Sequence, residues 1–433
     1  MLWEKVNVKV EGGLDFDLPR MFWVEQKFNK QKLDDVRQTT KEELNKVLSS
    51  DLEGKRIAIT AGSRGISNIS SIVKAIADFL KEKGAKPFVV PAMGSHGGAT
   101  AEGQRELLAE YGITEEAMGV PVVSSMDVVE IGTSDDGVPV YCDKEAYNSD
   151  GIVVCNRVKP HTDYRGPHES GLLKMMAIGL GKHKGATAIH KMGFDRFETV
   201  IPNVGKVFLK KAPILCGVAI VENAYHETML IEAVKPERFV ERDKALLKIA
   251  KENMPRFLLS HIDLLIVDEI GKDISGDGMD PNVIGRTGSR LPGFETIPIQ
   301  KIAVLDLTED TNGNGIGIGL ADVTSYNLVR KLDLAPSYIN AITSTVLEGV
   351  KIPVVMNSDR EAIALGLATC NRIEPKNAGV VRIKNTLSLY TIEVSEAYLN
   401  EVEKSDVLVK LTEPAPWRFD AQGNLIREYY HKR

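Results

Sequence analysis

The stretch "KRIAITAGSRGISNISSIVKAIADFLKEKGAK", residues 55–86, contains two hydrophobic patterns in direct succession. An uninterrupted apolar run over residues 56–60 leads into a turn of small residues, which is typical of a buried strand. Apolar residues then recur at helical spacing until Gly84, and glycine commonly ends a helix. The stretch therefore predicts a strand, a turn and a helix.

The same order recurs along the first half of the chain. "PFVVPAMGSHGGAT" (87–100) predicts a strand and a glycine-rich turn, and "AEGQRELLAEYG" (101–112) predicts the helix that follows. "DGIVVCNRVKPHT" (150–162) predicts a strand over 152–156 that ends in a polar loop. Alternation of strands and helices favours an α/β fold whose sheets are mainly parallel and carry helices on their faces.

A second strand-rich series follows residue 261. We predict strands in "IDLLIVDEIG", "KIAVLDLTED" and "IPVVMNSDREAIALGLATC", and helices in "ADVTSYNLVRKL" and "APSYINAITSTVLEG". The chain is then two α/β domains, over residues 1–258 and 262–395, with the active site in the cleft between them. The tail after about residue 395 is predicted to pack back on the first domain.

The composition excludes several classes of partner. The 433 residues carry 54 basic and 60 acidic side chains, a net charge of −6, so no global basic field attracts nucleic acid or acidic lipid. The N-terminal residues are charged where a signal peptide would be apolar, and no apolar run reaches the roughly 20 residues of a membrane helix. The four cysteines are scattered without CxxC spacing. We expect reduced, structural cysteines and a cytoplasmic protein.

Three loops that follow predicted strands carry Arg64, His96 and His161. Ligands of open α/β sheets bind beyond the carboxyl ends of the strands, so these side chains are candidates for one site. An arginine before a helix suits a carboxylate or phosphate, and the glycines and serines around His96 let a backbone approach a ligand closely. Alternatively, each residue alone is a surface arginine or a turn histidine.

Lys174 lies within the apolar run "SGLLKMMAIGLG" (170–181). Such a lysine is either a surface residue whose stem is buried or a desolvated amine with a lowered pKa, suited to covalent chemistry. His190 is a possible metal ligand, whereas His168 and His183 lie in contexts typical of solvated residues. The chain has no HExxH, CxxC, GxSxG or proper GxGxxG motif, which argues against zinc hydrolases, α/β-hydrolases and dinucleotide binding.

The five candidates together resemble the nickel-dependent lactate racemase family in order and spacing. The separation of Arg64 from His96, and that of Lys174 from His190, is close to the spacing of the corresponding residues in that family. "ESGLLKMMAIGLG" is similar to the family's lysine-bearing run, and "SGDGMDPN" (275–282) is similar to a motif of its second domain. The resemblance extends over residues 54–282 and is specific as a set.

The resemblance implies a nickel-pincer nucleotide, the nickel complex of pyridinium-3,5-bisthiocarboxylic acid mononucleotide, loaded by cofactor-synthesis proteins. Lys174 would attach it covalently as a thioamide, and His190 would be a ligand of the nickel. Ser63, Ser95 and Gly94 would contribute to cofactor binding. The N-terminal domain would then bind cofactor and metal, and the C-terminal domain would lie on the substrate side.

The implied activity is that of a racemase or epimerase of 2-hydroxy acids. It would act by reversible hydride transfer from C2 of the substrate to the cofactor. His96 and His161 would exchange the roles of base and acid, because neutral imidazole is well matched to proton transfer near pH 7. Arg64 would hold the substrate carboxylate.

Departures from the family pattern lie where substrate would be bound. Ala61 stands where the family usually has an acidic residue, and Arg286 and Arg290, with Asp277, replace the pattern expected around a small methyl group. We therefore expect a substrate more polar than lactate. Two alternatives stay open: a nicotinamide-dependent 2-hydroxy acid dehydrogenase, and a non-catalytic family member that only binds the cofactor.

Overall fold

The computed structural model describes residues 10, 12–48, 52–63 and 65–430. The chain divides into two compact units, one over Asn29–Met254 and one that joins the segment up to Phe28 to Pro255–Arg433. Each unit contains a mixed sheet with helices, so the predicted α/β class is confirmed. No helix in the described ranges is both long and apolar enough to cross a membrane.

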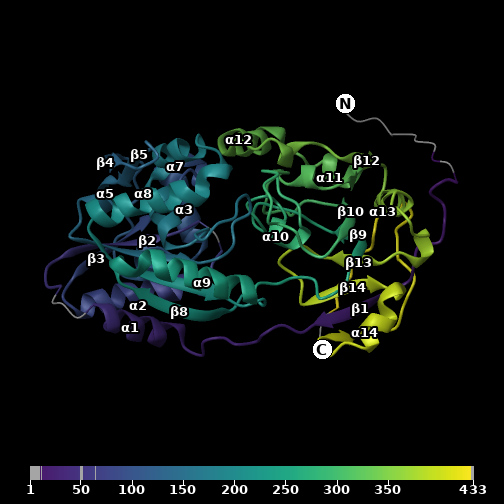
Figure 1. Cartoon of the computed structure of the whole chain (residues 1–433), viewed down its shortest axis with the longest axis horizontal. Helices are drawn as coiled ribbons and strands as arrows, with labels where there is room; N and C mark the ends of the chain where they lie inside the picture. Colours follow the sequence, from purple (N-terminus) through teal and green to yellow (C-terminus); the bar gives the residue numbers. More distant parts are fainter. Residues whose placement is uncertain (1–9, 11, 49–51, 64, 431–433) are drawn as a thin grey trace. The chain divides into compact units, whose positions relative to one another are not determined.

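The sheet of the Asn29–Met254 unit has five strands in the order β3-β2-β6-β7-β8. Figure 1 labels three of them, β2, β3 and β8. The first four are parallel, and β8 is antiparallel to β7. A separate hairpin is formed by β4 and β5. The strands are β2 (Arg56–Ala61), β3 (Lys86–Pro91), β4 (Val128–Thr133), β5 (Pro139–Asp143), β6 (Gly151–Arg157), β7 (Ile214–Glu222) and β8 (Thr228–Val234).

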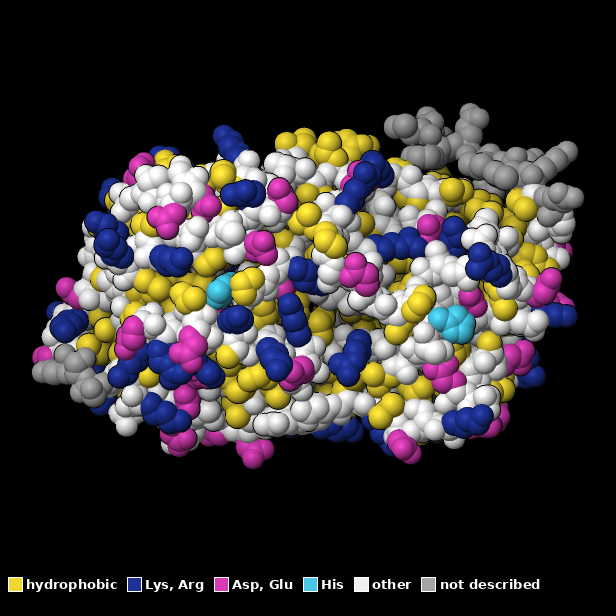
Figure 2. Space-filling view, viewed as in Figure 1, with side chains coloured by type: hydrophobic (Ala, Val, Ile, Leu, Met, Phe, Trp, Pro, Cys, Tyr) yellow, Lys and Arg dark blue, Asp and Glu magenta, His cyan; other side chains and the backbone are white. Residues whose placement is uncertain are grey.

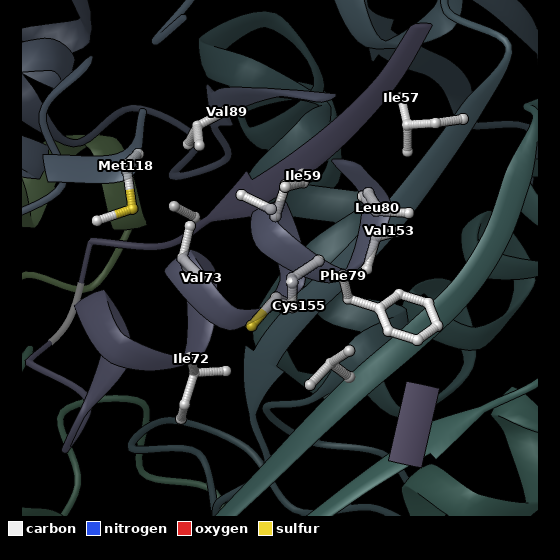
Figure 3. Close-up of a cluster of buried hydrophobic side chains, with 14 of the residues drawn as sticks. Ile57, Ile59, Ile72, Val73, Phe79, Leu80, Val89, Met118, Val153 and Cys155 are labelled. Atoms are coloured by element: carbon white, nitrogen blue, oxygen red, sulfur yellow. The ribbon is translucent and has the colours of Figure 1, made fainter. Parts of the chain in front are cut away.

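Helix α2 (Ile69–Glu82) covers one face of this sheet. Figure 3 shows Ile72 and Val73 of α2 in the same apolar cluster as Ile59 of β2 and Cys155 of β6. Each such side chain stabilises the fold by roughly 1.5–3 kcal/mol when it is fully buried. The apolar strand and the helical periodicity that the sequence predicted therefore meet in one core.

The opposite face of the sheet carries α6 and α9. A side chain at Gly217 of β7 would lie 2.6 Å from Leu172 of α6 and 2.9 Å from Phe239 of α9, so these helices approach the strand backbone closely. The other helices of the unit are α1 (Val36–Val47), α3 (Ala101–Glu110), α4 (Glu115–Met118), α5 (Lys144–Tyr147), α6 (Leu172–Lys174), α7 (Lys182–His190), α8 (Phe197–Lys211) and α9 (Phe239–Asn253).

The second unit is built on an eight-stranded sheet in the order β12-β11-β10-β9-β13-β14-β1-β15. The first five strands are parallel, and β14, β1 and β15 extend the sheet with antiparallel pairs. Its strands are β1 (Met21–Gln26), β9 (Ile262–Val267), β10 (Ile299–Val304), β11 (Val323–Ser325), β12 (Val354–Met356), β13 (Val380–Ile383), β14 (Thr391–Ser395) and β15 (Leu408–Lys410).

The predicted domain limits were wrong at both ends. Strand β1 pairs with β14 and β15, so the N-terminal segment and the tail both belong to the second unit. The residues of β1 have their partners near the other end of the chain, as Met21 pairs with Ser395. Local sequence patterns carry no information on such a pairing.

One predicted helix of the second unit, over 321–332, begins instead as a strand. Val323, Thr324 and Ser325 form β11 between β10 and β12, and only α11 (Tyr326–Val329) is helical. β-Branched residues favour this position in a sheet. The other predicted helix is α12 (Leu334–Ser344), and hydrophobic side chains gather over it at the surface (Figure 2), among them Ile339 and Ile342 at 62% and 67% exposure.

Candidate active site

The loops after β2, β3 and β6 lie at one edge of the sheet, because these three parallel strands are neighbours. They carry Ser63, His96 and His161 respectively. The structure brings Ser63 and His96 together through a hydrogen bond between Ser63 Oγ and His96 Nδ1. Arg64, the predicted substrate ligand, lies outside the described residues.

The turn that carries His96 packs on the lysine-bearing segment. Gly94 adopts a φ of +60°, and a Cβ there would lie 3.1 Å from Ile178 Cγ2 and 3.5 Å from Ala186. Only glycine combines this backbone conformation with such a close approach. Gly94 thus allows the turn to pack closely against Ile178 and Ala186. The predicted cofactor contacts of Gly94, Ser95 and Ser63 stay predictions.

The His161 ring has a defined environment. Its Nδ1 accepts a hydrogen bond of 3.0 Å from the backbone N–H of Asp163, so the neutral ring carries its proton on Nε2. The ring packs on Tyr164 and Phe194 at centroid distances of 4.6 and 5.8 Å. The imidazole is therefore oriented by one backbone amide and two aromatic rings.

Glu169 holds the loop of His161, a role that no motif in the sequence signals. Its side chain is buried and accepts from the His161 backbone N–H at 2.7 Å. It also pairs with Arg165 at 3.2 Å and with Lys251 of α9 at 2.5 Å. Two cations offset the cost of burying this carboxylate and fix the loop that follows β6.

His190 ends α7 and presents its Nε2 lone pair. Its Nδ1 lies 2.7 Å from the carbonyl of Ala186, and because a carbonyl only accepts, Nδ1–H is the donor. Burial lowers the pKa of His190, and the charge of Lys174 acts in the same direction. A neutral imidazole whose Nδ1–H is bonded to a carbonyl is the form in which histidine binds metals through Nε2.

Lys174 ends α6 and directly precedes a π-helix over Met175–Leu180. Such wide turns are rare and often occur at functional sites. The first turn of α6 is held by buried Asp243, which accepts from the Leu172 and Leu173 amides at 2.9 and 3.2 Å. Lys174 itself is half-buried and within electrostatic range of His190.

The prediction for His168 was wrong. The residue is buried at 7% exposure, and its Nε2 lies 2.9 Å from the carbonyl of Val240, which makes it part of the packing around α9. His183 is exposed, as its context indicated. The fully buried lysine of this segment is not Lys174 but Lys182, which the sequence analysis did not single out.

A cavity of about 500 Å³ adjoins α7. Its polar lining consists of Tyr141 from β5 and His183, Lys184, Thr187 and Lys191. Lys184 Nζ lies 4.4 Å from the centroid of the Tyr141 ring. The lining contains cations and hydroxyls but no carboxylate, so it suits an anionic group.

Protein side chains alone do not form a metal centre in the described ranges, since no three His, Cys, Asp or Glu gather there. The predicted nickel site uses one protein ligand, so this finding does not test it. The four cysteines are free and buried, as expected of structural residues. Burial raises the pKa of the Cys155 thiol to about 12, which keeps it protonated and unreactive.

Two arginines of the second unit are engaged by local acceptors. Arg286 pairs with Asp322 at 2.8 Å and also donates to the carbonyls of Leu320 and Gln300, each at 3.1 Å. Arg290 pairs with Glu348 at 2.6 Å, but its side chain is 70% exposed. Of the two, Arg290 has the more exposed side chain.

The fold and the site define an α/β protein with two histidine-bearing loops at one sheet edge, followed along the chain by a segment that carries Lys174 and His190. Residues 39–199 match the family model of the lactate racemase N-terminal domain. This part of the chain is therefore similar to the lactate racemase N-terminal domain.

Solved structures agree on the fold. The lactate racemase apoprotein from Thermoanaerobacterium thermosaccharolyticum superposes with a TM-score of 0.52 at 15% identity, over 85% of this chain and 99% of that one. A protein from Thermotoga maritima solved by a structural genomics consortium gives a TM-score of 0.51 at 13% identity, over 82% and 97% of the two chains. No curated protein sequence matches the chain.

Proposed function

We propose that the protein is a racemase or epimerase of 2-hydroxy acids. The observation that carries the proposal is the position of two imidazoles after β3 and β6, the strands on either side of β2. Inversion at C2 requires one proton-transfer group for each stereoisomer. Two histidines on separate loops at one sheet edge are suited to that requirement.

Ser63 suits His96 to both roles. A hydroxyl both donates and accepts, so Ser63 Oγ can donate to an unprotonated Nδ1 or accept from Nδ1–H. The opposite nitrogen of His96 can therefore carry a proton as the acid or a lone pair as the base. His161 accepts from the backbone N–H of Asp163 at 3.0 Å, and the Asp163 carboxylate, 3.9 Å from Nδ1, would stabilise the protonated ring electrostatically.

The residues present fit a nickel-pincer nucleotide. His190 offers a neutral Nε2 for nickel, and Lys174 places an amine within electrostatic range of it for a covalent thioamide link. Lys184 and Lys191 provide positive charge for a phosphate beside the helix that ends in His190. When bound, this cofactor supplies the hydride acceptor that C2–H cleavage requires.

A substrate more polar than lactate remains part of the proposal. Arg290 is the more accessible of the two arginines in the second unit, and bidentate guanidinium contacts favour carboxylates. Aldonic acids, malate and 2-hydroxyglutarate are therefore the compounds to compare with lactate.

The test is to co-produce the full chain with cofactor-synthesis proteins and to measure three quantities. These are intact mass, nickel content and inversion of each hydroxy acid by chiral chromatography. Inversion by the loaded protein, absent from the unloaded one, is expected. Turnover that requires added NAD would establish the dehydrogenase instead, and cofactor loading without inversion of any compound would indicate a cofactor-binding protein.

A further inference from the structure

Lys182 is a fully buried lysine that lies midway along the chain between Lys174 and His190, the two residues proposed to hold the cofactor. Its Nζ donates to the carbonyl of Pro91 at 2.5 Å and to Gln104 Oε1 at 3.2 Å. It also lies 3.1 Å from Asp143 Oδ2, in an ion pair with both side chains at 0% exposure. The ammonium thus joins the end of β3, α3 and β5.

The burial of this ion pair costs folding free energy. Burial lowers the pKa of Lys182 and raises that of Asp143, because both charges are withdrawn from water. Lys182 also adopts a φ of +51°, a left-handed conformation that is unfavourable for a residue with a side chain. Strained or buried polar residues persist where the surrounding structure requires them, and such residues cluster at functional sites.

Gln104 connects Lys182 to the turn of His96. The Gln104 side chain is fully buried, and its Nε2 donates to the carbonyls of Gly94 at 2.9 Å and His96 at 3.1 Å. The amide must present Nε2 to these two carbonyls and Oε1 to a donor. Lys182 supplies that donor, so the ammonium fixes which way the amide points.

We propose that Lys182, acting through Gln104, is a positioning residue that clamps the Gly94–His96 turn and so sets the orientation of the His96 imidazole. Its place on the chain ties this orientation to the segment that carries Lys174 and His190. The catalytic part of the inference rests on the proposed racemase function, whereas the orientation of His96 can be measured without it.

Two variants distinguish an effect on the orientation of the Gly94–His96 turn from an effect on the stability of the fold. Lys182→Met removes the ammonium, leaves Asp143 buried without its cation and is expected to lower the melting temperature markedly. Gln104→Leu keeps the Lys182–Asp143 ion pair and removes the two donors to the turn, together with the Oε1 that accepts from Lys182. Lys210→Met, on the neighbouring helix α8 and away from the clamp, is the matched control.

The readout is the nitrogen chemical shifts of His96 in full-length protein with ¹⁵N-labelled histidine, before and after cofactor loading. We expect Gln104→Leu to shift the His96 signals and leave those of His190 unchanged. Inversion of both stereoisomers should fall by about 10- to 100-fold at normal nickel content, the usual effect of losing a residue that orients a functional group. Lys182→Met, where folded, should do the same.

Unchanged His96 signals in Gln104→Leu would overturn the positioning role, whatever the activity of the protein. Shifted His96 signals in a wild-type background that inverts no 2-hydroxy acid would leave the clamp standing and refute the racemase proposal instead. Full activity in Gln104→Leu despite shifted signals would overturn the catalytic part of the inference.

Discussion

His161 and His190 pack against the same aromatic ring, that of Phe194, at centroid distances of 5.8 and 5.6 Å. Phe197 completes this group, 5.3 Å from His190 and 4.7 Å from Phe194. One histidine comes from the loop after β6 and the other from the end of α7. The aromatic pair therefore couples the position of the proposed acid–base group to that of the proposed nickel ligand.

Replacing Phe194 by leucine should disturb both histidines at once. The loss of the ring removes a packing surface from each imidazole, and misplacement of reacting groups by about 1 Å can reduce rates by about 100-fold. We expect the NMR signals of His161 and His190 to move and those of His96 to stay. Movement of the His190 signals alone would show that the two histidines are independent.

Lys174→Ala should abolish covalent attachment of the cofactor and leave the fold intact, because the side chain is half-buried at the end of a short helix. Intact mass after co-production with cofactor-synthesis proteins measures this directly. Lys206→Ala, at an exposed position of α8, is the control. An equal mass increase in Lys174→Ala and wild type would remove Lys174 from the proposed site.

His190→Ala should lose nickel more than it loses organic cofactor, since the other ligand atoms would belong to the cofactor. The measurement is nickel per attached cofactor, from metal analysis and mass on one sample. An unchanged ratio would make His190 structural. His183, which lines the neighbouring cavity, would then be the next residue to test.

Single replacements of His96 and His161 by alanine should each block complete inversion, by about 10²–10⁴-fold. The first half-reaction should survive for one stereoisomer in each variant, and the surviving stereoisomers should differ. Rapid mixing of loaded protein with each pure stereoisomer, followed by cofactor absorbance, tests this. Loss of both half-reactions in one variant would assign that histidine to binding.

Asp243 provides a prediction of pH dependence. Burial raises its pKa, while the amides of Leu172 and Leu173 and the charge of His168 act against this. A carboxyl group with a raised folded-state pKa binds more protons when folded, so stability is lost as pH rises from about 3.9 through the folded-state pKa. The unfolding free energy of wild type should therefore fall relative to Asp243→Asn over this range.

Urea unfolding of both proteins at a series of pH values, from mildly acidic to neutral, measures the difference. If wild type instead gains stability over Asp243→Asn as pH rises, the hydrogen bonds from the Leu172 and Leu173 amides lower the pKa of Asp243 by more than burial raises it. Asp243 would then be ionised at the start of α6.

The sequence predicted those parts of the molecule that local patterns determine. The apolar run of β2 and the helical periodicity of α2 follow each other directly, and the histidine loops follow strands whose parallel order makes them neighbours. The pairing of β1 with β14 joins opposite ends of the chain, and no local pattern encodes it. His168 and Lys182 were misjudged or overlooked for the same reason, because their burial depends on Val240 and Asp143.

The π-helix after Lys174 and the left-handed residue Lys182 interrupt the regular α-helix between Lys174 and His190. In one straight α-helix, the Cα atoms of Lys174 and His190 would be about 24 Å apart and their side chains would point about 160° away from each other. The π-helix and the left-handed residue depart from that straight geometry, and the charge of Lys174 contributes to lowering the pKa of His190. A single deletion or insertion in α7 would rotate His190 by about 100° about the helix axis relative to Lys174. The proposed cofactor site therefore depends on the length of this segment as well as on its side chains.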